Sequence, residues 1–239
     1  MLKVTGKLWP IGRLTKLAVW AVALASTAPA TTRADERRQA ADGDVDVKAS
    51  RVYVYVGKVG LGHEHAIVGQ LKLGKVQLGA ANRAGEIVFD MPTFSADTDD
   101  ARQFIGLEGT TAAGRRKEVT DNMLGADVLN VRKFPTATFE IASALPLKKR
   151  SNEGHAMYRL DGDFTLHGVK RPIKVDAELL DAEQGFRLRG AFAIKQTDFG
   201  IKPFSKAFGA VGVTDELTIH GDLLIAAQRT AQKSGKKRK

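Results

Sequence analysis

The sequence predicts a mostly β protein: an antiparallel barrel of eight strands with one or two short helices. Apolar and polar residues alternate with a period of two, clearly around Phe139 and Phe164. Strands with one wet face and one dry face read this way. Turn signals follow these segments at short spacing, which suits an up-and-down barrel better than a parallel sheet with helical crossovers. Between two atypical ends lie about 180 residues without an internal repeat, the size of one domain.

The N-terminal 30 residues are predicted to be a secretory signal peptide. They carry four Lys or Arg and no acidic residue, and residues 17–25 form an apolar core too short to span a bilayer. Ala28-Pro29-Ala30 supplies small residues for cleavage after Ala30, with cleavage after Ala34 as the alternative. We therefore expect a periplasmic or secreted protein; an uncleaved membrane anchor is the competing interpretation.

Residues 31–47 are polar with scattered charge and are expected to form a linker before the barrel domain, 48–227.

The expected strands cover residues 51–57, 65–74 with a continuation to 78, 86–91, 137–141, 158–166, 173–179, 185–197 and 216–226. In the second of these strands the alternation places Ile67, Leu71 and Leu73 on one inward face.

Residues 97–129 interrupt the alternation and are expected to be helical. Helix formers gather at 114–124, where Val119 and Met123 form a thin apolar stripe. The acidic trio Asp97, Asp99 and Asp100 lacks the spacing of a calcium loop and fits a helix N-cap cluster better.

The net charge of +10 resides in the two ends of the chain. The tail from 229 to 239 carries six Lys or Arg and no acid, which leaves 27 basic against 27 acidic residues between the ends. A nucleic-acid-binding face should appear as a surplus of basic residues in the domain itself, so we expect no nucleic-acid partner. We expect residues 228–239 to be a disordered basic tail; a tether to an anionic membrane surface is the alternative.

His63 and His65 form the constellation best placed for chemistry. In an extended strand residues i and i+2 share a side, so both imidazoles would face the cavity together with Ile67, near its mouth. Polar lining of the mouth is the first interpretation. A metal site is the second, because two imidazoles can bind one zinc, copper or iron ion, although a third ligand would have to come from elsewhere. An exposed turn is the third.

The sequence offers no catalytic arrangement in support of an enzyme. It shows no nucleophile elbow, no His-Glu-x-x-His motif and no glycine-rich phosphate loop opening a helix. His155 and His220 fall on polar sides of their strands and are expected at the surface, and His167 is expected in a two-residue hairpin turn. The chain also lacks cysteine, which excludes disulfides and a lipid-modified cysteine anchor.

Four segments together resemble the YceI-like family. They are KFPTATF at 133–139, GDFTLHGVKRP at 162–172, FSADT at 94–98 and IKQTDFGI at 194–201. The resemblance spans about 50 to 226 and implies a periplasmic, lipocalin-like barrel that holds a long isoprenoid-type amphiphile. It also implies that the helical region caps the barrel near its ligand, although Val128 and Leu129 replace the family's usual aromatic pair there.

We therefore interpret the chain as a non-catalytic binding protein whose partner is an amphiphilic lipid, a polyisoprenoid or a quinone-like molecule. The apolar barrel interior follows from the alternation, whereas the ligand class follows from the resemblance. The rival is a metal- or redox-linked periplasmic protein that uses His63 and His65. A homodimer is left open. The expected ligand-binding residues are Ile67, Leu71, Phe89, Phe139, Phe164, Leu188 and Phe192, with His63 and His65 at the mouth.

Overall fold

The computed structural model describes residues 43–226 of the chain. The predicted signal peptide, its cleavage site after Ala30 and the basic tail lie outside the described residues, as does the predicted linker up to residue 42.

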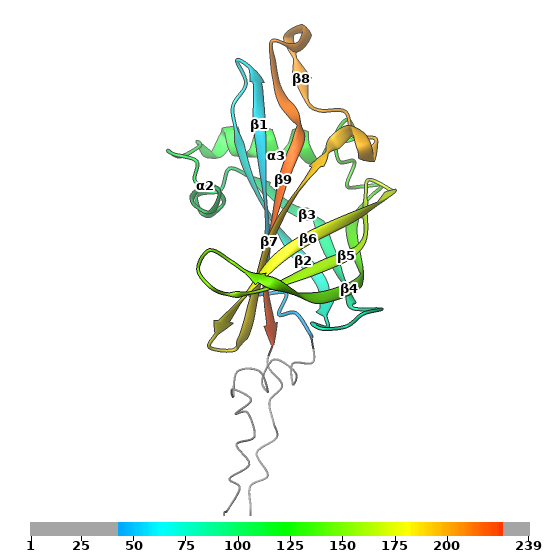
Figure 1. Ribbon diagram of the computed structural model, residues 1–239. Coiled ribbons are helices and arrows are strands. Elements are labelled where there is room, and N and C mark those ends of the chain that lie inside the picture. The colour runs from blue at the N-terminus through cyan, green and yellow to red at the C-terminus, as the bar shows by residue number, and fades with distance from the viewer. Residues whose placement is uncertain (1–42, 227–239) are drawn as a thin grey trace, which may run out of the picture.

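Eight strands form one closed antiparallel ring, as the alternation predicted (Figure 1). Neighbours in sequence pair with each other from β1 to β7, then β7 pairs with β9, and β9 closes the ring on β1. The two-residue strand β8 pairs antiparallel with the first residues of β9. The strands are β1 (Arg51–Gly60), β2 (His65–Val76), β3 (Gly85–Ala96), β4 (Thr136–Arg150), β5 (Ala156–Leu166), β6 (Val169–Ala182), β7 (Gly185–Lys195), β8 (Ser205–Lys206) and β9 (Val211–Ala226).

The period-two pattern places one side chain in two inside the ring. Phe139 on β4 pairs with Phe164 on β5, and both are buried, whereas the adjacent Glu140 is exposed and pairs with Lys170 outside. The turn from β5 to β6 uses His167 at φ 52° and Gly168 at φ 79°, the two left-handed residues that a tight hairpin turn of this hand requires. The predicted position of His167 in a hairpin turn is confirmed.

Strand β2 departs from the predicted alternation. Its pairing with β3 shifts register between Val68 and Gln70 and again between Leu71 and Leu73. An irregularity of this kind rotates the following residues to the other face. Leu73 is therefore 45% exposed, contrary to the prediction that it faces inward, and Val76 is buried instead.

The first described residues pack onto the barrel where a linker was expected. Val45 is buried, bridges to Ile225 on β9, and donates its backbone N–H to the Gly74 carbonyl at 2.9 Å. A Cβ on Gly74 would lie 2.8 Å from Val45 Cβ, so this glycine leaves the space that Val45 fills. Residues 44–47 thus belong with the fold, and both ends of the described chain leave the ring at one end (Figure 1).

Two helices lie in the region where the alternation stops: α2 (Asp99–Ile105) and α3 (Ala113–Leu124). Thr98 caps α2, with its side-chain oxygen accepting from the Ala101 N–H, and Asp99 and Asp100 occupy the first turn. No helix within 43–226 is long and apolar enough to cross a membrane.

Helix α2 covers the outer face of the ring beside β1. Its residue Phe104 stacks on Tyr53 with ring centroids 3.7 Å apart and approaches His220 on β9 at 6.0 Å. His220 is therefore half-buried, which corrects the prediction that it is a surface residue. The polar side of β9 faces outward as predicted, but a helix packs over it.

Candidate functional site

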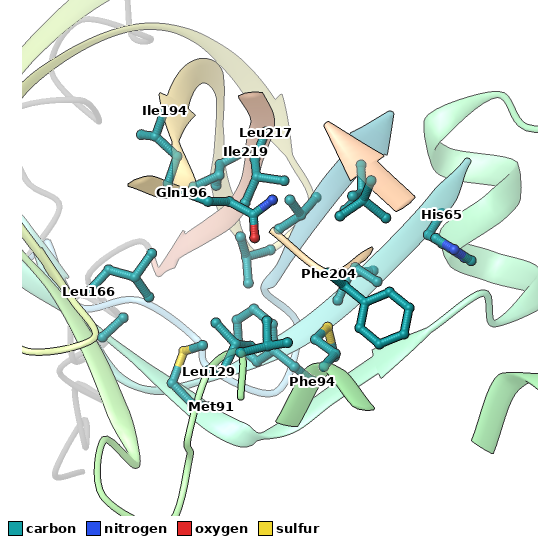
Figure 2. Close-up of a pocket in the computed structure, with 18 of the residues that line it drawn as sticks. His65, Met91, Phe94, Leu129, Leu166, Ile194, Gln196, Phe204, Leu217 and Ile219 are labelled. Carbon is teal, nitrogen blue, oxygen red and sulfur yellow. The ribbon is translucent and has the colours of Figure 1, made fainter. Parts of the chain in front are cut away.

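The principal cavity lies inside the barrel, at the end away from Val45 and Ala226. Its volume is about 160 Å³, and 19 of its 22 lining residues are apolar. The three polar exceptions are His65, Asn122 and Gln196. The wall therefore suits an apolar group and offers few hydrogen-bonding positions (Figure 2).

Two strands and one packing glycine shape the wall of this cavity. Val52 and Val54 on β1 alternate inward, as predicted. The ring of Phe94 on β3 lies over Gly69, where an added Cβ would come within 2.3 Å of the ring. Gly69 is thus required for Phe94 to lie flat against β2 and line the cavity.

Helix α3 forms one side of the cavity through its apolar stripe. Val119 and Met123, which the sequence placed on one face, both line it. Thr120 holds the helix to β3, where its hydroxyl accepts the Ala96 N–H at 3.0 Å. No residue of α3 is fully buried, and its N-cap residue Ala112 makes no side-chain capping bond. Helix α3 therefore covers one side of the cavity without burying any of its own residues completely.

A second hollow of about 50 Å³ lies deeper in the barrel and shares Val52, Phe89 and Ile219 with the first. Phenylalanine rings line both hollows. Phe164 makes edge-to-face contacts with Phe89 at 6.1 Å and with Phe192 at 5.8 Å, an arrangement favoured by aromatic quadrupoles.

His65 stands at the polar side of the cavity in a fixed orientation. Its Nδ1 lies 2.7 Å from the Asp97 carboxylate, and because a carboxylate only accepts, the proton is on Nδ1. Asp97 also accepts the Ala66 N–H at 3.0 Å and pairs with Arg102. Nε2 of neutral His65 is left as an acceptor.

The Asp97 carboxyl is only 2% exposed and has an unusual backbone, with φ at 54°. Although its burial raises the pKa, the hydrogen bonds from His65 and Ala66, with the charge of Arg102, lower the pKa of Asp97 below its ordinary value. A left-handed non-glycine residue costs on the order of 1 kcal/mol or more, and its side-chain contacts offset that strain. Asp97 therefore serves His65 and is not a helix-capping residue; Thr98 has that role.

The structure does not bring His63 and His65 together on one strand face. His63 precedes β2, its side chain is exposed, and it is not part of the cavity wall. The shared orientation assumed for the two imidazoles is therefore wrong, because β2 begins only at His65. Among residues 43–226, the group that gathers three potential metal ligands is Glu153, His155 and Glu178, which does not include either.

The other sequence-predicted site residues divide between the two hollows. Ile67, Phe89 and Phe164 line the principal cavity. Phe139, Leu188 and Phe192 line the deeper one with Phe89, whereas Leu71 is buried but lines neither.

Gln196 is a polar wall residue that was not among the ligand-binding residues predicted from the sequence. Strand β7 alternates inward through Leu188, Phe192 and Ile194, and Gln196 continues the same phase as the first residue of the 3-10 helix η1 (Gln196–Phe199). It is 4% exposed. The sequence signal that could have identified Gln196 is a polar residue at an inward position of an otherwise apolar strand face.

Comparison with known proteins decides the family. The sequence model of the YceI-like domain matches residues 44–224. The chain belongs to the YceI-like family. Proteins of this family are binding proteins, and the ring of strands with an internal cavity is consistent with that.

Related YceI-like sequences occur in several bacteria. The UPF0312 protein of Ectopseudomonas mendocina is 32% identical over 153 residues, which cover 61% of this chain and 67% of that protein. The UPF0312 protein of Pseudomonas paraeruginosa is 34% identical over 124 residues, covering 49% of this chain and 59% of that protein. The matches thus span 59% to 67% of these relatives' own length.

A solved structure shares the fold. The crystal structure of Burkholderia cenocepacia BcnA superposes with a TM-score of 0.50 and 19% identity, over 75% of this chain and 98% of BcnA. This likeness supports the architecture of the YceI-like domain.

Proposed function

We propose that this protein is a non-catalytic carrier that holds the apolar chain of an amphiphile inside the barrel, with an isoprenoid or quinone-type lipid as the ligand class. The observation that carries the proposal is the cavity itself: about 160 Å³ with 19 apolar residues among 22 in its wall. Burying one methylene there contributes about 0.8 kcal/mol, so a chain can bind without many polar contacts.

The size of the cavity suggests how a longer chain would be accommodated. An apolar cavity of about 150 Å³ holds a molecule the size of benzene. A longer chain therefore needs the deeper hollow as well, and Phe89, which lines both, would have to turn aside. We infer that the chain enters beside α3 and extends past Phe89 toward Phe139 and Leu188.

The proposed place of action is the periplasm or the exterior of the cell. Support comes from the N-terminal segment, with its basic lead-in, its apolar core and the small residues that end at Ala30. Sequencing the N-terminus of the protein recovered from its own cells tests this, and an intact residue 1 would contradict cleavage.

Filling the cavity from the helix side tests the binding function. Met123→Trp should place a large ring in the cavity and lower the affinity for a fluorescent apolar probe, N-phenyl-1-naphthylamine, at least tenfold. Met157→Trp is the matched control, because Met157 lies on β5 outside the cavity wall. Native mass spectrometry of the wild type should also show a co-purifying mass in the lipid range. Equal probe binding by both variants would overturn the proposed site.

A further inference from the structure

Gln196 is a nearly fully buried amide in a mostly apolar wall. It is 4% exposed and lies at the end of β7, where its side chain joins the cavity lining. Its backbone is fixed by the turn that follows, because its carbonyl accepts the Ile201 N–H at 3.1 Å. The side chain is thus positioned by the fold.

The amide has one possible orientation. Nε2 donates to the backbone carbonyl of Thr214 on β9 at 2.7 Å. Because a carbonyl oxygen cannot donate, the nitrogen must be on that side and Oε1 on the other. Figure 2 shows the oxygen of Gln196 directed into the cavity.

Oε1 of Gln196 has no hydrogen-bond donor among residues 43–226. A buried acceptor left without a partner is unfavourable, because it has lost its hydrogen bond to water without gaining one in the fold. The cavity therefore presents an acceptor that a ligand group can satisfy. No Lys or Arg is among the wall residues, so the wall offers no fixed positive charge to an anionic group.

We propose that Gln196 Oε1 accepts a hydrogen bond from the ligand's hydroxyl group, so that this protein selects amphiphilic alcohols or phenols over ethers and carboxylates. The proposal rests on the proposed carrier function. A carboxylate would bring only acceptor atoms and a negative charge against the mostly apolar wall. An ether oxygen would face Gln196 Oε1, and neither atom can donate a hydrogen bond. A site built to hydrogen-bond a hydroxyl discriminates strongly against analogues that lack it.

A set of three probes with one chain length tests the proposal: octanol, octyl methyl ether and octanoate. Each displaces N-phenyl-1-naphthylamine from the full-length protein. Wild type should bind octanol about tenfold tighter than the ether, the scale of one hydrogen bond. Equal affinities for octanol and the ether would overturn the headgroup inference while leaving the carrier function intact. Failure of all three to displace the probe would instead count against the carrier function.

Two variants locate the acceptor. Gln196→Met should abolish the preference for octanol over the ether, because the variant has no side-chain acceptor for the hydroxyl. Asn122→Leu removes the other amide of the wall and should keep the preference. The reverse result would assign the acceptor to Asn122 and overturn the inference for Gln196. If Gln196→Met does not fold, the wild-type comparison of octanol with its ether still tests whether the wall accepts a hydroxyl, and a lost preference in Asn122→Leu still overturns the assignment to Gln196.

Discussion

At the scale of single residues, the surroundings of each histidine decide its chemistry more than its position in the sequence does. His65 is fixed by Asp97, whereas His63 is exposed. His220 lies against Phe104 under α2, where burial lowers the pKa of its imidazole below the ordinary value. The three imidazoles therefore lie in three different environments.

Replacing His220 with Gln should flatten the pH dependence of stability. An imidazole in the unfolded chain binds its proton near pH 6.5, whereas folded His220 resists protonation. As pH falls through 6.5 the unfolded state binds more protons, so the free energy of unfolding of the wild type decreases. Urea unfolding at several pH values between about 7.5 and 5 measures the slope. His63→Gln removes an exposed imidazole and is measured for comparison. An unchanged slope in His220→Gln would contradict the explanation.

The inward register can be tested with one adjacent pair. Phe139→Asp buries a carboxylate at a position only 5% exposed and should cost several kcal/mol, a large fraction of a domain's stability. Glu140→Phe removes only an exposed ion pair with Lys170 and should leave the melting temperature nearly unchanged. Melting temperatures of both variants provide the comparison, and similar values would show that the register is wrong.

At the scale of elements, α3 is held less firmly than the strands it covers. It contributes Val119 and Met123 to the cavity wall but buries no residue completely. Weakly attached elements open at lower free energy than a core strand does. We therefore expect α3 to set how fast a ligand exchanges.

Adding a capping residue to α3 should stabilise the helix and slow exchange. Ala112 is its exposed N-cap, with an extended ψ of 141° and no side-chain bond. Ala112→Ser should stabilise the helix by about 0.5–2 kcal/mol. Amide hydrogen exchange across 113–124 should slow, and apolar probe release should slow with it. Ala113→Ser, one residue beyond the cap, is the control. Slower exchange without slower probe release would show that α3 is not the gate.

Local patterns predicted the strands well and their irregularities poorly. The alternation around Phe139 and Phe164 was sufficient to predict which side chains face into the ring, because every strand with one buried face has the same period of two. The position of Leu73 depends on the pairing of β2 with β3, and the burial of His220 depends on a helix far away in the sequence, so neither leaves a local signal. The apolar inner face of the ring was predictable, whereas the place of His63 depended on where β2 begins.

At the scale of the whole molecule, the basic excess remains confined to the ends of the chain. Deleting residues 229–239 removes six Lys or Arg and should leave the melting temperature nearly unchanged, because strand β9 ends at Ala226. Binding to vesicles with anionic lipid should weaken, and wild-type binding should fall with added salt, since exposed charges are screened beyond about 10 Å at 0.1 M. Vesicle sedimentation at two salt concentrations measures this. A truncated protein that unfolds would show that the tail supports the fold.

The bridge between Val45 and Ile225 marks the pole of the barrel where both described chain ends lie. Both chain ends leave the ring at one pole, while Val213 and Leu217, which line the cavity, lie on the half of β9 nearer the other pole. A protein held at a surface by the segment that follows Ala226 would therefore carry its principal cavity at the pole away from that surface, and a bound ligand would lie on the aqueous side.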